Sequence, residues 1–215
     1  MRANQYPEDR GPLAHPVRPA SFVEINNFYT ATVYEKGAEV IGMLKRLVGD
    51  DAYYAACNLY FDRHDGEAAT IEDWIAVFED TTGRDLTQFA RWYAQAGTPH
   101  LHVTEDHAGD TYRLTLRQDL PATPDGSPKE PQLIPVSMGL LAQDGREVLE
   151  TQMLELTEIE QVFTFNGITQ KPILSVLRDY SAPVIVHHAQ SAADRAVLLA
   201  HDTDPFNRWD AGRML

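Results

Sequence analysis

The chain has 215 residues, of which 43% are hydrophobic and 23% are charged, and its formal net charge is −14. This length allows one large domain or two smaller ones with buried cores. The acidic balance argues against nucleic acid and against an anionic membrane surface as partners, because both attract basic faces.

The cysteine content and the first residues bear on the compartment. The sequence holds one cysteine, Cys57, which cannot form an internal disulfide, so nothing indicates an oxidising environment. The first residues are polar and lack the apolar middle of a signal peptide. No apolar run approaches the roughly 20 residues that span a bilayer. We therefore expect a cytoplasmic protein.

Residues 1–97 are expected to be irregular at first and then helical. Residues 6–20 hold four prolines, so regular structure is not expected there. A helix is predicted from Thr32, where Thr32 and Glu35 fit a capping box. Further short helices are predicted to follow from possible N-caps at Asp50, Thr70 and Asp85. Four short helices with short links indicate part of a packed helical domain.

Residues 98–188 have the pattern of strands. Alternation of apolar and polar residues begins at Leu101 and continues through about seven short strand candidates. Asp144-Gly145 separates two of them and predicts a hairpin. These features predict an antiparallel β-sandwich. Residues 189–215 turn helical again and are expected to begin another helical domain.

The sequence contains no obvious metal site or nucleophile. It has no His-Glu-x-x-His, no paired Cys-x-x-Cys and no glycine-rich phosphate loop. His100 and His102 would share one strand face as a possible metal pair, but a third ligand is missing nearby, which favours a surface role. His187 and His188 would point to opposite faces. We predict no metal ligands in this chain.

One segment resembles a known catalytic motif. Taken by residue type alone, Tyr34 lies at a helix start and is expected to be a packing residue. The run Tyr-Glu-Lys-Gly-Ala-Glu-Val from Tyr34 to Val40 resembles the tyrosine motif of the aminopeptidase N family of zinc exopeptidases. Segments in the same order along the whole chain resemble the bacterial branch of that family, including Gln-Tyr-Pro-Glu-Asp at 5–9 and Arg-Trp-Asp-Ala at 208–211.

The resemblance implies an α+β fold with three parts. Residues 1–97 would be the C-terminal helical portion of a thermolysin-like catalytic domain. Residues 98–188 would be an Ig-like β-sandwich, and residues 189–215 the start of a C-terminal helical domain.

The resemblance also implies chemistry. In the family, zinc and a glutamate activate water against the first peptide bond of a substrate with a free N-terminus. Tyr34 matches the residue whose phenol donates a hydrogen bond to the resulting oxyanion, while Tyr29 and Asn26 match residues lining the pocket for the first side chain. The family's zinc-binding and amino-end-binding motifs precede the tyrosine and are absent here. We expect an internal fragment that is inactive alone, its zinc belonging to missing portions of the same enzyme.

Two other hypotheses remain open on the sequence. The chain could be a non-catalytic interaction module in which Tyr34 is a packing residue. It could also be a naturally short or inactive relative. An exposed Tyr34 on an open face with apolar edges would favour a missing partner domain.

Overall fold

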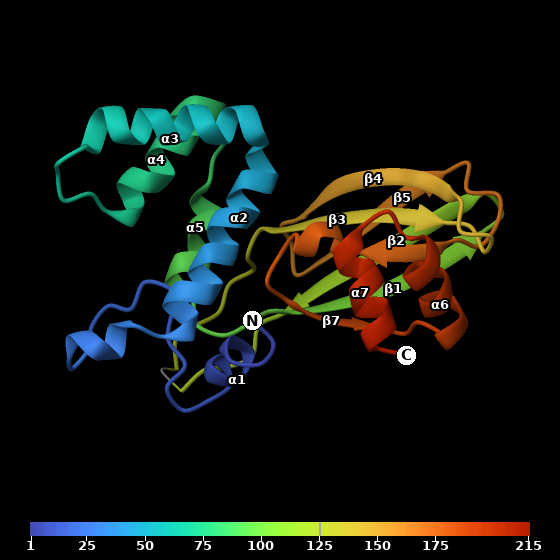
Figure 1. Ribbon diagram of the computed structural model, residues 1–215, viewed down its shortest axis with the longest axis horizontal. Coiled ribbons are helices and arrows are strands. Elements are labelled where there is room, and N and C mark those ends of the chain that lie inside the picture. The colour runs from blue at the N-terminus through green and yellow to red at the C-terminus, as the bar shows by residue number, and fades with distance from the viewer. Residues whose placement is uncertain (125) are drawn as a thin grey trace. The chain divides into compact units, whose positions relative to one another are not determined.

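The computed structural model describes residues 1–124 and 126–215. The chain divides into two units, Met1–Ala96 and Gly97–Leu215 (Figure 1). Helices make up the first unit, and strands with two terminal helices make up the second, which confirms the α+β class. The three domain ranges drawn from the resemblance stay a prediction.

The first unit contains the predicted run of helices. Its longer elements pack around a core that includes Met43, Leu44, Phe78, Phe89 and Trp92. Its elements are α1 (Gln5–Asp9), the short turns η1 (Ile25–Phe28) and η2 (Thr32–Lys36), α2 (Gly37–Val48), α3 (Asp50–His64), α4 (Ile71–Thr82) and α5 (Thr87–Ala94).

The predicted helix starts fare differently from one helix to the next. Thr70 forms a capping box with Asp73 and so begins α4 as predicted. The N-cap of α5 is Leu86 and not the predicted Asp85, although the Asp85 carboxylate accepts the Thr87 N–H at 2.8 Å. The cap predicted at Asp50 is wrong, because Gly49 is the N-cap of α3 and no side chain bonds there.

The proline-rich segment is not wholly irregular. Residues 5–9 form α1, although Pro7 lies within it. Proline is tolerated in a first helical turn, because the amide it lacks would have no partner inside the helix. The expectation that residues 6–20 lack regular structure is therefore wrong for this one turn.

The second unit contains the predicted sandwich. One sheet has the order β5-β2-β1-β7 and the other has the order β4-β3-β6. The strands are β1 (His100–Ala108), β2 (Thr111–Asp119), β3 (Ile134–Leu141), β4 (Glu147–Leu156), β5 (Glu160–Asn166), β6 (Ile173–Val176) and β7 (Ile185–His188). The pairing is antiparallel with one difference from the prediction, because β7 runs parallel to β1 with Ile185 opposite His100.

The hairpin predicted at Asp144-Gly145 is confirmed between β3 and β4. The Gly145 N–H donates to the Ala142 carbonyl at 3.0 Å, and Gly145 has φ of 85°. A Cβ at this glycine would lie 2.2 Å from the ring of His201. Both the backbone conformation and the close approach of His201 therefore require glycine.

Two helices complete the second unit. They are α6 (Ala192–His201) and α7 (Pro205–Arg213), and they lie beside the strands (Figure 1). Leu198 of α6 and Ala211 of α7 form one buried cluster with Leu141 and Ile173. Every residue of β3, the central strand of its sheet, is buried. No helix among the described residues is long and apolar enough to cross a bilayer.

A buried arginine joins the end of α6 to the sheet. Arg178, in the short turn η3 (Arg178–Tyr180), is 2% exposed. Its guanidinium pairs with Glu147 of β4 at 2.5 Å and with Asp202 at 3.2 Å. Its Nε donates to Ser175 of β6 at 3.0 Å. Because Asp202 follows α6 directly, this network fixes the helix end against β4 and β6.

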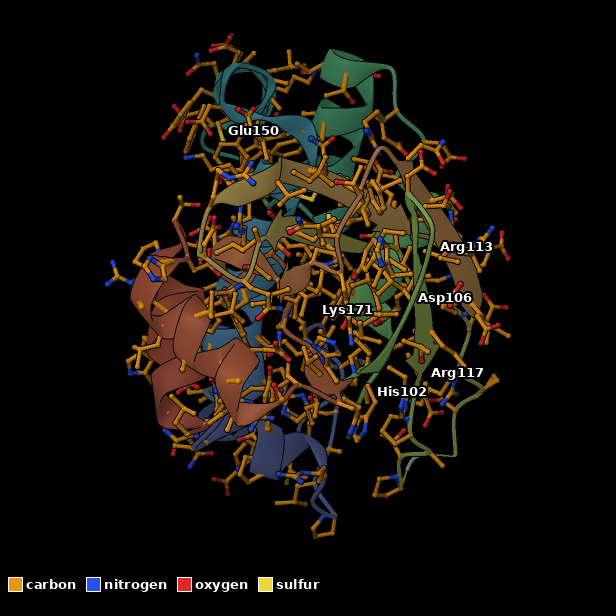
Figure 2. All side chains as sticks on the ribbon, turned by 90° about the vertical axis from the view of Figure 1, so that its right-hand side faces the viewer. His102, Asp106, Arg113, Arg117, Glu150 and Lys171 are labelled. Carbon is orange, nitrogen blue, oxygen red and sulfur yellow. The ribbon has the colours of Figure 1, made fainter. Side chains whose placement is uncertain are left out.

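Polar and charged side chains lie in pairs along the ladder between β1 and β2 (Figure 2). His102 stands opposite Arg117, and Asp106 opposite Arg113, at 3.2 Å from its guanidinium. Next to Asp106, Glu105 is more enclosed and accepts hydrogen bonds from Tyr112 at 2.7 Å and His188 at 2.6 Å. Burial alone would raise the pKa of Glu105, but the hydrogen bonds from His188 and Tyr112 outweigh it and hold that pKa below its usual value of 4.5.

Glu105 should make the stability of the second unit depend on acid. A carboxyl group whose pKa is lower in the folded state stabilises the fold above its unfolded pKa, and this contribution is lost as the pH falls through the folded pKa. We expect the melting temperature of the chain to fall as the pH drops below about 4.5. In Glu105→Gln this fall should be smaller. The matched control is Glu150→Gln, at an exposed position on β4 (Figure 2). Parallel pH profiles for wild type and Glu105→Gln would contradict the assignment.

Candidate active site

Tyr34 lies in η2, a single π-helical turn that runs directly into α2. Its N–H donates to the Thr30 carbonyl at 3.1 Å. Thr32 and Lys36 on the same turn are fully buried, whereas the Tyr34 side chain is 58% exposed. Residues two positions apart on a helical turn point to nearly opposite sides. The turn therefore has an inner face at Thr32 and Lys36 and an outer face at Tyr34.

A carboxylate from α1 caps this turn. Glu8 Oε1 accepts hydrogen bonds from the N–H of Thr32 at 2.8 Å and from its hydroxyl at 2.6 Å. Glu8 Oε2 accepts from the Ala31 N–H at 3.3 Å. The capping box predicted for Thr32 and Glu35 is therefore wrong, because the Thr32 hydroxyl donates to Glu8 instead of accepting from its own helix.

A buried ion pair holds the other end of the turn. Lys36 Nζ lies 2.9 Å from Asp9 Oδ2, and both side chains are fully buried. Charged groups are almost never buried without a partner, because removing them from water costs several kcal/mol. The pair therefore fixes the end of η2 to the end of α1.

An aromatic cluster continues outward from Tyr34. The rings of Tyr29 and Tyr34 stack with centroids 6.0 Å apart and planes at 27°. Phe28 meets Tyr29 edge-on at 6.1 Å, and Phe22 lies 5.7 Å from Phe28. Tyr29 is 60% exposed and nearby Val23 is 94% exposed. Tyr34 thus lies on an open face with apolar edges. This is the arrangement that we expect where a partner domain is missing.

The structure brings the three predicted site residues together to different degrees. Tyr29 and Tyr34 are in ring contact. Asn26 lies in η1 with an exposed side chain, and its carbonyl accepts the Tyr29 N–H at 3.4 Å. The contact of Asn26 with Tyr29 is therefore a main-chain hydrogen bond.

The first unit also has a half-open cavity of about 530 Å³. Ile41, Tyr60, Trp74 and Tyr93 are among its lining residues. Asn26, Tyr29 and Tyr34 do not line it. The candidate residues thus occupy an open face and not this cavity.

The histidines of the second unit do not form a metal site. His187 Nε2 lies 2.8 Å from His100 Nδ1, and the His187 ring stacks on His102 at 4.6 Å. His188 turns away to Glu105. Throughout residues 1–124 and 126–215, no group of three or more His, Cys, Asp or Glu side chains is arranged to hold a metal ion. The described residues do not fit a zinc site.

Comparisons with known proteins match both units. Residues 1–93 match the model of the Peptidase family M1 domain, and residues 97–189 match that of a domain of unknown function (DUF3458) with an Ig-like fold. Aminopeptidase N of Caulobacter vibrioides is 49% identical over 217 residues, covering 100% of this chain and 25% of that protein. The chain belongs to the aminopeptidase N family.

Other aminopeptidases agree with this assignment. Aminopeptidase N of Escherichia coli is 42% identical over 225 residues, covering 100% of this chain and 26% of that protein. The crystal structure of Legionella pneumophila aminopeptidase A in complex with aspartic acid has a TM-score of 0.86 and 31% identity, over 93% of this chain and 23% of that one. The chain spans about a quarter of the length of the curated aminopeptidases N that it matches.

Sequence reasoning missed the two contacts that hold the turn carrying Tyr34, namely Glu8 with Thr32 and Asp9 with Lys36. Glu8 lies 24 residues before Thr32, and Asp9 lies 27 residues before Lys36, so no local sequence pattern links the members of either pair. The available signal was that Glu8 and Asp9 lie in one of the segments that resemble the aminopeptidase N family.

Proposed function

We propose that this chain is part of a zinc-dependent aminopeptidase that removes N-terminal residues from peptides, and that Tyr34 stabilises the tetrahedral oxyanion. The observation that carries this is the Tyr34 phenol, more than half exposed on a turn whose opposite face is fully buried. Apart from its stacking on Tyr29, the side chain is left open to a ligand, and the resemblance of its motif to that of the aminopeptidase N family supports the oxyanion role.

The chemistry follows from the phenol. Attack of water on the first peptide carbonyl places negative charge on its oxygen, and an O–H group aimed at that position stabilises the charge as it develops. The phenol of Tyr34 can donate one such hydrogen bond. Stacking against Tyr29 limits the directions in which the Tyr34 ring can turn. The donor is therefore oriented before the substrate arrives.

Tyr29 and Asn26 are proposed to line the pocket for the first side chain of the peptide. Both are exposed on the same segment as Tyr34, and Tyr29 offers an aromatic surface next to the phenol. The names of the relatives support a peptide with a free N-terminus as substrate. The Legionella relative was solved with aspartic acid, a free amino acid of the class that such a reaction releases.

The zinc and the groups that bind the amino end belong, in this proposal, to residues outside the chain. The described residues of this chain do not fit a zinc site. The exposed apolar edge at Phe22, Val23 and Ile25 is suited to contact with those further portions of the enzyme. The free thiol of Cys57 agrees with a reducing compartment such as the cytoplasm.

The purified chain is expected to show no hydrolysis of aminoacyl-arylamides and no stoichiometric zinc, because a lone oxyanion donor lacks the activated water. Arylamide assays and metal analysis of the chain would be run beside the intact enzyme as the positive control. Turnover by the chain alone that a chelator abolishes would contradict the division of roles proposed here.

A further inference from the structure

We infer, resting on the proposed function, that Glu8 and Asp9 of α1 are positioning residues that set the place of the Tyr34 phenol. They do so through Thr32 and Lys36, which lie two residues before and two residues after Tyr34. Neither carboxylate takes part in the proposed chemistry directly. Their effect on the reaction would pass through the turn that carries the phenol.

The geometry puts one anchor on each side of Tyr34. Glu8 binds the N–H of Thr32 at 2.8 Å and its hydroxyl at 2.6 Å. Asp9 binds Lys36 Nζ at 2.9 Å. Thr32 and Lys36 are fully buried on the inner face, whereas Tyr34 lies on the outer face. A turn fixed at both ends can neither slide along its axis nor rotate, so the outer side chain keeps one position.

The turn itself explains why anchors are needed. η2 is a π-helical turn, a form that is rare and appears mostly as single turns, often at functional sites. Its first amides have no partners inside the helix. Glu8 supplies an acceptor for Ala31 and Thr32 from 23 and 24 residues upstream. The conformation that presents Tyr34 therefore depends on α1 and not only on its own sequence.

The expected consequence is a specific kinetic defect. A misplacement of about 1 Å in a reacting or binding group can cost about 100-fold in rate. The oxyanion exists only after attack, so a displaced donor lowers kcat and leaves KM largely unchanged. Loosening either anchor is expected to lower kcat by about 10- to 100-fold.

The test uses the intact enzyme and two sets of variants. Glu8→Met removes the acceptor, and Glu8→Gln, which keeps an acceptor oxygen, is its conservative partner. The double variant Asp9→Asn with Lys36→Met removes both charges of the second anchor together, so that neither remains buried alone. Val77→Ala in α4 is the control for general loss of packing, because Val77 is fully buried and lies outside the anchors.

Each variant is made with and without Tyr34→Phe, and thermal melts check that each one folds. Positioning predicts that Glu8→Met and the double variant lower kcat when Tyr34 is present and have little further effect in the Tyr34→Phe background. Glu8→Gln is expected to recover most of the activity. Val77→Ala is expected to lower the melting temperature without changing kcat.

Three outcomes would overturn the inference. The first is a kcat loss of equal size with and without Tyr34→Phe, and the second is unchanged kcat in folded anchor variants. Failure of both anchor variants to fold would assign them to stability alone and would also overturn it. Failure of the proposed function is separate, because Tyr34→Phe by itself would then retain nearly normal kcat.

Discussion

Replacing Tyr34 by phenylalanine in the intact enzyme is expected to lower kcat by about 100- to 1000-fold, the usual cost of losing one oxyanion donor. The change removes a single oxygen from an exposed ring, so folding and the Tyr29–Tyr34 stacking should persist. KM should change little, because the lost hydrogen bond forms only as charge develops on the substrate oxygen. Steady-state kinetics on an aminoacyl-arylamide would measure both constants.

The matched control for this prediction is Tyr54→Phe. Tyr54 lies on α3 and is 56% exposed, close to the 58% of Tyr34, so the same atom is removed from a similarly exposed ring. Its kinetics should match those of the wild type. A nearly normal kcat for Tyr34→Phe would refute the oxyanion role.

Arg178→Met is expected to cause the largest loss of stability, about 3–5 kcal/mol in the free energy of unfolding of the second unit. The substitution removes the cation that lies 3.2 Å from Asp202, whose side chain is fully buried. A buried carboxylate without its cation costs far more than the pair contributes. Urea unfolding of the chain would measure the change in free energy. Hydrogen exchange of the amides of β3 and β6 would then locate the loss in the second unit.

The control for Arg178→Met is Arg113→Met in the same unit. Arg113 also pairs with an aspartate, Asp106, but both side chains are substantially exposed. Exposed ion pairs contribute about 0–1 kcal/mol, so this variant should remain close to wild type. Equal losses in the two variants would show that burial of Asp202 is not the cause.

Strands β1 and β2 could be predicted because each has one buried face and one more accessible face. β1 and β2 alternate between buried and more accessible residues, and the sequence pattern shows this directly. The extent of β4, Glu147–Leu156, could not be predicted in the same way, because its residues are mostly exposed or half-buried and the alternation is weak. The parallel pairing of β7 with β1 could not be predicted, since the pattern of a strand does not identify its neighbour.

The site shows the same division between local and distant causes. Tyr34 was found through its resemblance to the tyrosine motif of the aminopeptidase N family. Local capping rules predicted the wrong partner for Thr32, because its hydroxyl donates a hydrogen bond to the Glu8 carboxylate of α1. Lysine is usually found at the surface, and only the fold shows that Lys36 is buried in an ion pair with Asp9. Contacts that join distant segments are outside what local spacing can show.

The most direct test of the central claim compares the affinity of wild-type and Tyr34→Phe enzyme for a phosphinic peptide, whose tetrahedral oxygen mimics the oxyanion, and for a product amino acid. If Tyr34 donates to the oxyanion, the affinity for the phosphinic peptide should fall by the same factor as kcat/KM, while product affinity stays unchanged. Unchanged affinity for the phosphinic peptide, or equal weakening of both ligands, would contradict that role.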